Sequence, residues 1–249
     1  MIAEPSFYVA AFFVVLLTGV SKSGFGTAGG FAVPVLALTI APQQAAAIML
    51  PILLIMDAFG LVAFRGKFDR ANLRIILPGA VLGIVMGSLT FGSFDQHWIR
   101  GLIGVESVVF ALDRFRKAAI PIPQRPGTRL QGWFWGTVSG FTSFVSHAGG
   151  PPIMQYLLPQ GMDKVKLVGT TVIYFSVVNF LKLGPYAALG LLDLGNLTTS
   201  TLLLPIVPIG FWLGLKLLHW LDQRRFNLTL TWLLLLTGLK LLWDAVFSG

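Results

Sequence analysis

Two short glycine-rich segments, half a chain apart, combine residue types that bind small anions. Tip 1 (residues 23–30) reads Ser-Gly-Phe-Gly-Thr-Ala-Gly-Gly, and tip 2 (residues 143–150) reads Ser-Phe-Val-Ser-His-Ala-Gly-Gly. Glycines let the backbone turn sharply and let a ligand approach closely. A helix that resumes after such a turn presents free amides with a partial positive charge, which attract anions. The composition of both tips therefore favours an anion site.

Lysines inside apolar segments strengthen this interpretation. Lys22 directly precedes tip 1, and Lys182 lies near Asn179 in an apolar run. Ionisable groups inside a membrane are costly and usually mark a substrate or ion pathway. The candidate substrate-binding residues are Lys22, Ser23, Gly24, Gly26, Thr27, Gly29, Gly30, Ser143, Ser146, His147, Gly149, Gly150, Asn179 and Lys182. In the alternative, the small residues only let helices pack closely, and Lys182 snorkels or pairs structurally.

Other intramembrane polar residues fit more than one role. By repeat position Asp57 matches the neighbourhood of Lys182, so we expect a structural ion pair between them, with proton coupling as the alternative. His147 could donate to an anion or titrate near neutrality, and it could equally be a satisfied core histidine. Glu106 lies in the weakest apolar span, and the sequence gives it no role.

The elements that must position these residues are membrane helices. The chain is 55% hydrophobic and 11% charged, whereas soluble domains carry about 25% charged residues. Several apolar runs reach the roughly 20 residues needed to cross a bilayer: 43–64, 75–94, 165–192, 197–218 and 228–247. We therefore expect one all-α, multi-pass domain over residues 1–249, located in a cell membrane, bacterial and cytoplasmic. The N-terminal segment lacks the features of a cleaved signal peptide.

An internal repeat predicts how the helices are organised. Gly29-Gly30 matches Gly149-Gly150, and Leu77-Pro78 matches Leu204-Pro205. We predict repeat 1 over 6–112, a cytoplasmic linker over 113–129 and repeat 2 over 130–247. Each repeat would hold a broken or re-entrant hairpin and about three spanning helices. If both hairpins return to their side of entry, nearly all loop lysines and arginines fall on one face, which predicts inverted repeats with both termini outside.

Several function classes are disfavoured. The net charge of +8 is explained by basic loops that set topology, so no nucleic-acid partner is expected. The absence of cysteine excludes thiolate chemistry, and no ligand spacing suggests a metal. The nucleotide-binding pattern G-x4-G-K-[ST] and the catalytic G-x-S-x-G elbow are missing. We therefore expect neither an enzyme nor a cofactor.

The motifs resemble those of a known permease family. Gly19-x2-Lys22-Ser23-Gly24-Phe25-Gly26-x2-Gly29-Gly30-x3-Pro34 is similar to the first signature of the TauE/SafE sulfite-exporter-type permeases. The second signature resembles residues 140–152, followed by Gly169-Thr170 and Asn179-x2-Lys182-x3-Tyr186. The resemblance covers nearly the whole chain and implies export of a sulfur oxyanion or organosulfonate, such as sulfite or sulfoacetate.

These observations predict a secondary transporter that holds a small anion between the tips and works by alternating access. The alternatives are a passive channel for anions or small solutes, with the tips as its filter, and a membrane scaffold that transports nothing. The expected partners are the anion and the lipid bilayer. The exact substrate, the direction, the ion coupling and the oligomeric state, a homodimer included, stay open.

Overall fold

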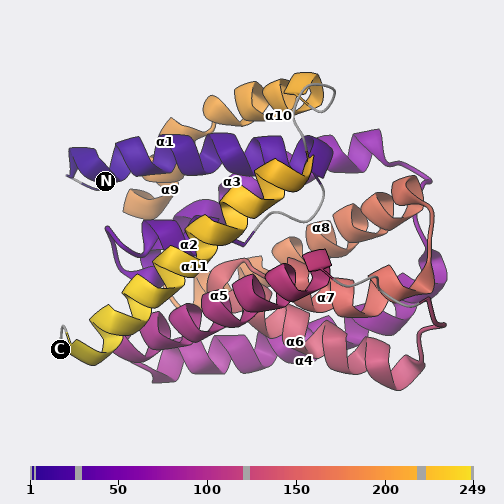
Figure 1. The fold of residues 1–249 in the computed structure, drawn as a ribbon. Coiled ribbons are helices and arrows are strands. Elements are labelled where there is room, and N and C mark those ends of the chain that lie inside the picture. The colour runs from indigo at the N-terminus through magenta and orange to yellow at the C-terminus, as the bar shows by residue number, and fades with distance from the viewer. Residues whose placement is uncertain (1, 3, 26–29, 120–123, 218–222, 248–249) are drawn as a thin grey trace.

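The regular structure is entirely helical in the part of the chain that the computed structural model describes, namely residues 2, 4–25, 30–119, 124–217 and 223–247 (Figure 1). The α-helices are α1 (Pro5–Val20), α2 (Ala32–Leu36), α3 (Pro42–Ala63), α4 (Arg70–Ser93), α5 (Gln96–Ala119), α6 (Arg129–Ser146), α7 (Gly150–Leu157), α8 (Lys164–Ala188), α9 (Leu194–Leu203), α10 (Ile206–Leu217) and α11 (Gln223–Phe247). A π-helical segment (Ser21–Phe25) continues α1, and a 3-10 turn (Leu158–Gln160) follows α7.

Five of these helices are long and apolar enough to cross a membrane by themselves. They correspond to α1, α3, α4, α8 and α11, and the pair α9 and α10, bent by 44°, makes a sixth candidate within the described residues. The multi-pass, all-α prediction is therefore confirmed. Helix α5 continues to Ala119, through the first residues of the segment predicted as the linker (113–129), and has basic residues in its last turn. Cations there interact favourably with the negative end of the helix dipole.

Helices α6 and α7 form a hairpin whose two ends meet. The Arg125 amide donates to the carbonyl of Pro159 at 2.7 Å, and a Cβ on Gly132 would lie 3.0 Å from the ring of Tyr156. Helix α7 has only 8 residues, about 12 Å of rise, which is less than half of the ~30 Å apolar thickness of a bilayer. The start of α6 and the end of α7 thus lie at the same end of the bundle.

Glycines let each hairpin pack tightly against a helix of the other half of the chain. Gly79 and Gly83 of α4 face the backbone of α6, where a Cβ on Gly83 would lie 2.0 Å from the carbonyl oxygen of Thr137. In the same way a Cβ on Gly210 of α10 would lie 2.7 Å from the carbonyl oxygen of Leu16 on α1. Small residues that permit such backbone approach are a main source of helix association in membranes.

Two helix pairs that join the N-terminal and C-terminal halves of the chain pack antiparallel. On α3, Asp57 contacts Asn179 of α8 and Gly60 faces Val172, so the numbering of the two helices runs in opposite directions. On α5, Gly101 faces Ala245 of α11 and Gly104 faces Leu242, again in opposite directions. Helices α3 and α5 therefore each run antiparallel to a helix of the C-terminal half.

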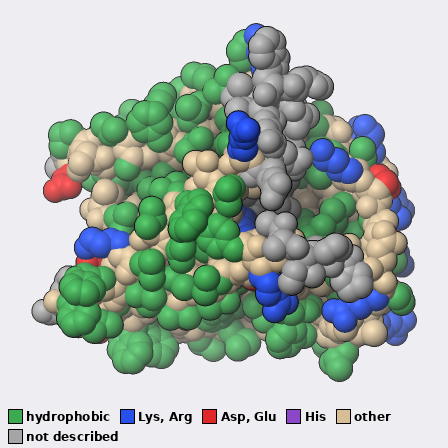
Figure 2. Space-filling view, in the orientation of Figure 1, with side chains coloured by type: hydrophobic (Ala, Val, Ile, Leu, Met, Phe, Trp, Pro, Cys, Tyr) green, Lys and Arg blue, Asp and Glu red, His purple; other side chains and the backbone are tan. Residues whose placement is uncertain are grey.

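One end of the bundle collects most of the basic loops. The loop before α4 meets the start of α8, where Lys166 pairs with Asp69 at 2.8 Å and the Asp69 amide donates to Thr170. Asn72 reaches Gln160 at the end of the α6–α7 hairpin. Lysine and arginine side chains gather at this end of the molecule, on the right in Figure 2, and the chain termini lie at the other end (Figure 1).

Candidate anion site

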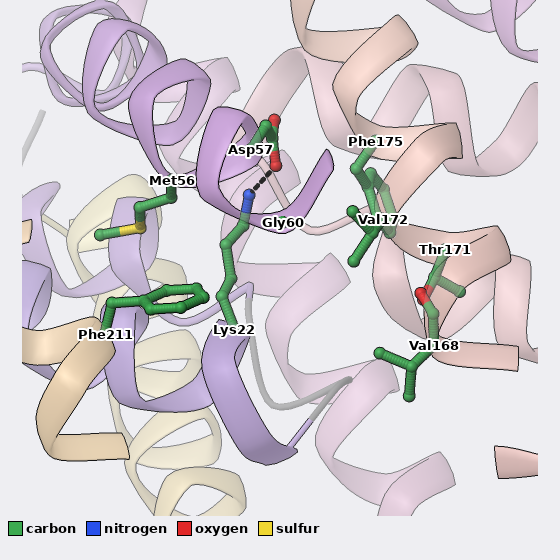
Figure 3. A pocket seen from close by; sticks show the side chains of 9 residues that line it. All are labelled: Lys22, Met56, Asp57, Gly60, Val168, Thr171, Val172, Phe175 and Phe211. Atoms are coloured by element: carbon green, nitrogen blue, oxygen red, sulfur yellow. Dashed lines mark hydrogen bonds and ion pairs between the residues drawn. The ribbon is translucent and has the colours of Figure 1, made fainter. Parts of the chain in front are cut away.

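The first charged group of the site is an ion pair between tip 1 and α3. Lys22, in the π-helical turn, pairs with the Oδ1 atom of Asp57 (Figure 3). Asn179 of α8 donates to the Oδ2 atom at 2.6 Å. The carboxylate is almost completely buried, whereas the Lys22 side chain is 25% exposed. Both oxygens of Asp57 are thus bonded, one within repeat 1 and one from repeat 2.

The second charged group, Lys182, is fully buried and has a different environment. Its Nζ atom lies 2.8 Å from the carbonyl oxygen of Ser143, 3.2 Å from the hydroxyl of Ser143 and 2.6 Å from Nδ1 of His147. Three acceptors match the three N–H groups of an ammonium. Within the described residues, no carboxylate forms an ion pair with Lys182. Lys22, Asp57 and Lys182 therefore leave one positive charge in excess.

His147 ends α6 in a backbone conformation that side chains rarely adopt. It has φ 55° and ψ 23°, and it is the one non-glycine residue with positive φ in the described part of the chain. Its Nε2 atom lies 2.9 Å from the carbonyl oxygen of Ala46 on α3, so this nitrogen carries the hydrogen and Nδ1 accepts from Lys182. A strained backbone conformation costs free energy and persists only where the surrounding structure holds the residue in place. Residues in such conformations cluster at functional sites.

Hydroxyl groups fix the shape of tip 2. Ser139 donates to the carbonyl of Gly149 at 2.7 Å, and Thr142 lies 3.4 Å from the carbonyl of Ala148. Tyr186 of α8 donates to the carbonyl of Phe144 at 2.6 Å. The Tyr186 bond satisfies a carbonyl in the last turn of α6, and the other two bonds hold the carbonyls of the segment between α6 and α7.

The two tips touch each other. A Cβ on Gly30, which has φ 107°, would lie 3.0 Å from the Cβ of Ala148. Gly24 lies in the π-helical turn, and the Ser23 hydroxyl donates to the carbonyl of Val20. Three predicted residues, Gly26, Thr27 and Gly29, lie outside the described residues. The structure does bring the other charged and polar candidates together around α3 and α8, namely tip 2, Lys22, Asn179 and Lys182.

Some expectations about this site need correction. Asp57 pairs with Lys22 and Asn179 instead of Lys182, because tip 1 carries Lys22 directly to the carboxylate. The resumed helix α7 offers fewer free amides than expected, since Pro151 and Pro152, directly after Gly149 and Gly150, have no N–H. The Ser146 hydroxyl is already hydrogen-bonded to Glu106 or Thr142. The ring N–H of His147 is already hydrogen-bonded to the carbonyl of Ala46.

The sequence did not identify some residues that the structure places beside the site. Glu106, to which the sequence gives no role, lies 2.7 Å from the hydroxyl of Ser146 in tip 2, and Tyr186, which the sequence names only within the second signature, holds the end of α6. Glu106 was visible as an acid in an apolar segment, but its partner lies 40 residues away in the sequence. The carbonyl of Ala46 carries no side-chain signal that sequence reasoning could detect.

A cavity of about 40 Å³ adjoins the Lys22–Asp57 pair (Figure 3). It is lined by Lys22, Met56, Asp57, Gly60, Val168, Thr171, Val172, Phe175 and Phe211. It lies on the side of Asp57 towards the C-terminal end of α3 and the N-terminal end of α8, which is the basic end of the bundle. A space of this size holds a water molecule, so water fits beside the ion pair on its side towards the basic end.

Comparison with known proteins places this geometry in a family. The family described as Sulfite exporter TauE/SafE matches residues 11–241, which is nearly the whole chain. The chain belongs to the TauE/SafE family. Membership in TauE/SafE makes it an integral membrane protein of a transporter family, whose members are not enzymes, and implies an exporter of the sulfite or sulfonate type. No curated protein and no solved structure matches the chain.

For a TauE/SafE protein, the site described above accounts for the two signatures that carried the resemblance. The first signature supplies Lys22 and Gly30, and the second supplies His147, Asn179 and Lys182. The structure joins them through Asp57, which lies in neither signature. Most residues of the polar cluster thus belong to the two signatures.

Proposed function

We propose that this chain is a secondary transporter that exports a small anion, a sulfur oxyanion or organosulfonate such as sulfite or sulfoacetate, across the cytoplasmic membrane. The observation that carries the proposal is the fully buried ammonium of Lys182, which is surrounded by neutral acceptors. A buried charge is expensive unless an opposite charge compensates it. A bound anion supplies that opposite charge.

The charges around the tips set the class of ligand. Asp57 balances Lys22, and Lys182 is the excess cation. A monovalent anion placed between the tips makes the cluster neutral. A cation would add a second uncompensated charge, and a neutral solute would leave Lys182 unbalanced. Lys182 and Lys22 would attract the anion, and Ser143, Asn179 and His147 would fix the two charged groups in position.

Alternating access is supported by the arrangement of the halves. Antiparallel packing of α3 with α8 and of α5 with α11 is the packing that inverted repeats produce. In this arrangement the α6–α7 hairpin enters from the basic, cytoplasmic end and the α1–α2 segment from the opposite side. The cavity beside Asp57 would then be the cytoplasmic approach, and a reorientation of the halves would open the site outward.

For an anion that crosses without a coupled ion, the membrane potential provides a driving force for export. No nucleotide-binding pattern is present in the sequence. With the cell interior negative, moving one net negative charge outward gains about 2.3 kcal/mol per 100 mV. This gain alone concentrates a monovalent anion outside by about fiftyfold at 100 mV.

Replacing Lys182 tests the proposal. Lys182→Met keeps the length of the side chain and removes its charge, and Lys164→Met changes an exposed lysine on the same helix as the control. Labelled sulfite is offered to inside-out membrane vesicles. We expect Lys182→Met to reduce uptake by about 10- to 100-fold, since hydrogen bonds to charged groups contribute roughly 1.5–3 kcal/mol, and Lys164→Met to transport normally.

The outcome that contradicts the proposal is equally clear. If correctly inserted Lys182→Met protein takes up sulfite at the wild-type rate, the excess cation is not part of the substrate site. The same vesicles test sulfate, thiosulfate and sulfoacetate, so that a shift of substrate is not mistaken for loss of transport. Lys22→Ala provides the corresponding test at tip 1.

A further inference from the structure

Glu106 is a buried acid that contacts tip 2 and that the anion site does not use. It lies in the middle of α5 with 8% of its surface exposed. Its Oε2 atom is 2.7 Å from the hydroxyl of Ser146, and its Oε1 atom is buried without a hydrogen-bond partner among the described residues. One hydrogen bond is little compensation for a carboxylate that is enclosed in apolar surroundings.

The geometry around Ser146 indicates that Glu106 carries a proton. The hydroxyl oxygen of Ser146 lies 2.7 Å from Glu106 and 3.0 Å from the carbonyl oxygen of Thr142. A hydroxyl has a single hydrogen and can donate it to only one of these oxygens. Both contacts are hydrogen bonds only if Glu106 donates to Ser146 while Ser146 donates to Thr142. If Glu106 were deprotonated, Ser146 would have to donate its hydrogen to Glu106 and would lose its hydrogen bond to the carbonyl of Thr142.

The surroundings of Glu106 contain few groups that could perturb its titration. From α6 the nearest are Ser146 and His147, and α2 carries no charged residue. On α3, Asp57 is bonded to Lys22 and Asn179. On α11, Lys240 pairs with Asp244, and Arg225 lies near the start of the helix. The charged groups of α5 itself are Arg100, Asp113, Arg114, Arg116 and Lys117. Four of these charged groups bond to partners other than Glu106, namely Asp57, Asp113, Lys117 and Lys240.

The two neighbouring residues of tip 2 connect Glu106 to the excess cation. Ser146 contacts Glu106, and the next residue, His147, contacts Lys182. Loss of the proton would place a negative charge beside tip 2 and would cancel the excess positive charge that attracts the anion. It would also withdraw the Ser146 hydroxyl from Thr142, at the point where α6 ends. Proton and anion therefore favour each other's binding.

We propose that Glu106 is the proton-coupling site of the transporter: it holds a proton while the anion is bound and releases that proton to water when the anion leaves. This inference rests on the proposed anion transport. One proton then moves in the same direction as each anion. For a monovalent anion the cycle is electroneutral, and the membrane potential acts only on a substrate that carries a further charge.

Binding measurements over a range of pH test this coupling. Purified wild type, Glu106→Gln and the exposed control Glu4→Gln are titrated with sulfite by calorimetry between pH 5.5 and pH 8.5. The amide that Glu106→Gln introduces would donate to Ser146 as a protonated Glu106 does, and it cannot ionise. Titration of sulfite itself is common to all three proteins and cancels in the comparison. We expect the affinity of wild type and Glu4→Gln to fall with pH relative to Glu106→Gln, by up to about tenfold per pH unit.

Proton counting gives the second readout in the same experiment. In buffers with different ionisation enthalpies, wild type should take up more protons per bound sulfite than Glu106→Gln at the upper end of the pH range, by up to one proton. If wild type and Glu106→Gln have the same pH dependence and the same proton count, the coupling proposal is overturned. If wild type binds none of sulfite, sulfate, thiosulfate or sulfoacetate, the proposed function fails instead.

Infrared spectroscopy tests the proton on Glu106 directly, in protein saturated with sulfite. Wild type at neutral pH should show the carbonyl stretch of a protonated carboxyl group, and Glu106→Gln should lack this band. Ser146→Ala removes the hydrogen-bond acceptor and should shift the band to higher frequency, which also assigns the band if Glu106→Gln is poorly produced. Absence of the band in wild type would overturn the proposal while leaving anion transport intact.

Discussion

Asn179 on α8 donates a 2.6 Å hydrogen bond to the carboxylate of Asp57 on α3, so residues from both halves of the chain meet on one charged group. Lys22 bonds the other oxygen of that carboxylate. The carboxylate of Asp57 thus connects the two halves at the centre of the polar cluster, beside the cavity that Lys22 and Asp57 line. Because the negative charge of Asp57 is balanced by Lys22, Lys182 is left as the excess cation.

Removing Asn179 should weaken this connection. Asn179→Ala deletes a buried hydrogen bond to a charged group, which contributes roughly 1.5–3 kcal/mol. At about 2–4 °C per kcal/mol for a chain of this size, the apparent midpoint of thermal unfolding in detergent should drop by about 3–12 °C. The exposed amide Gln96 provides the control, and Gln96→Ala should leave the midpoint within about 1 °C. An unchanged midpoint for Asn179→Ala would mean that the bond adds nothing to stability.

Packing at α4 and α6 should tolerate no side chain at its glycines. Gly83→Ala places a Cβ 2.0 Å from the Thr137 carbonyl oxygen, and Gly140→Ala places one 2.2 Å from the Ala80 carbonyl oxygen. Both should lower the unfolding midpoint by at least several degrees, since the helices must separate. Gly184 on α8 has nothing within 4 Å, so Gly184→Ala should be neutral or stabilising by about 0.5–1 kcal/mol. Equal effects at all three positions would contradict this account of the interface.

The left-handed backbone of His147 allows its conformation and its side chain to be tested separately. His147→Gly suits φ 55° and removes the acceptor of Lys182, whereas His147→Ala removes the same acceptor and keeps the strain. We expect both variants to lose sulfite transport and His147→Ala to be less stable than His147→Gly by about 1 kcal/mol. Transport by His147→Gly at the wild-type rate would show that only the turn is needed.

The Asp69–Lys166 pair at the basic end predicts a dependence of stability on pH. The Lys166 ammonium and the Asn72 amide hold the pKa of Asp69 below its ordinary value, so the unfolded state takes up this proton at higher pH than the folded state does. The stabilisation is therefore complete above about pH 5 and is lost as the pH falls below about 4. Asp69→Asn keeps a helix-capping side chain for α4 and removes the charge.

Thermal unfolding of both proteins between pH 7 and pH 3 measures this effect. The midpoint of wild type should exceed that of Asp69→Asn by a constant amount down to about pH 5, and the difference should shrink towards pH 3. A difference that grows on acidification would have the wrong sign for a carboxylate stabilised by a lysine.

Counterflow distinguishes a carrier from a channel. Proteoliposomes loaded with unlabelled sulfite and diluted into trace labelled sulfite should accumulate label transiently above the outside level, because a carrier exchanges one substrate molecule for another. A channel with the same tips would only let the label equilibrate. Saturation of the initial rate with sulfite, and its loss in Lys182→Met, should accompany the counterflow.

Hydropathy and the spacing of glycines predicted the helices and the tips well, because both signals depend on local sequence. Pairing of charged groups was harder to predict. The repeat alignment matches Asp57 to the neighbourhood of Lys182, but Asp57 pairs with Lys22, because the pairing depends on how tip 1 turns and how α3 and α8 rotate about their axes. The prolines at 151 and 152 were visible in the sequence, and their effect on free amides follows from chemistry alone. Ser146 and Glu106 meet only because α5 and α6 pack together.

The glycine seams have a consequence for how the molecule can move. Helix α6 is locked to α4 and helix α1 to α10, so each broken hairpin is bound to a partner from the opposite half of the gene. A rigid unit that carries tip 2 must therefore also carry α4, and one that carries tip 1 must carry α10. Any rigid unit that carries a tip is therefore built from both halves of the chain, and substitutions on the packed surface of either half are constrained by the surface of the other.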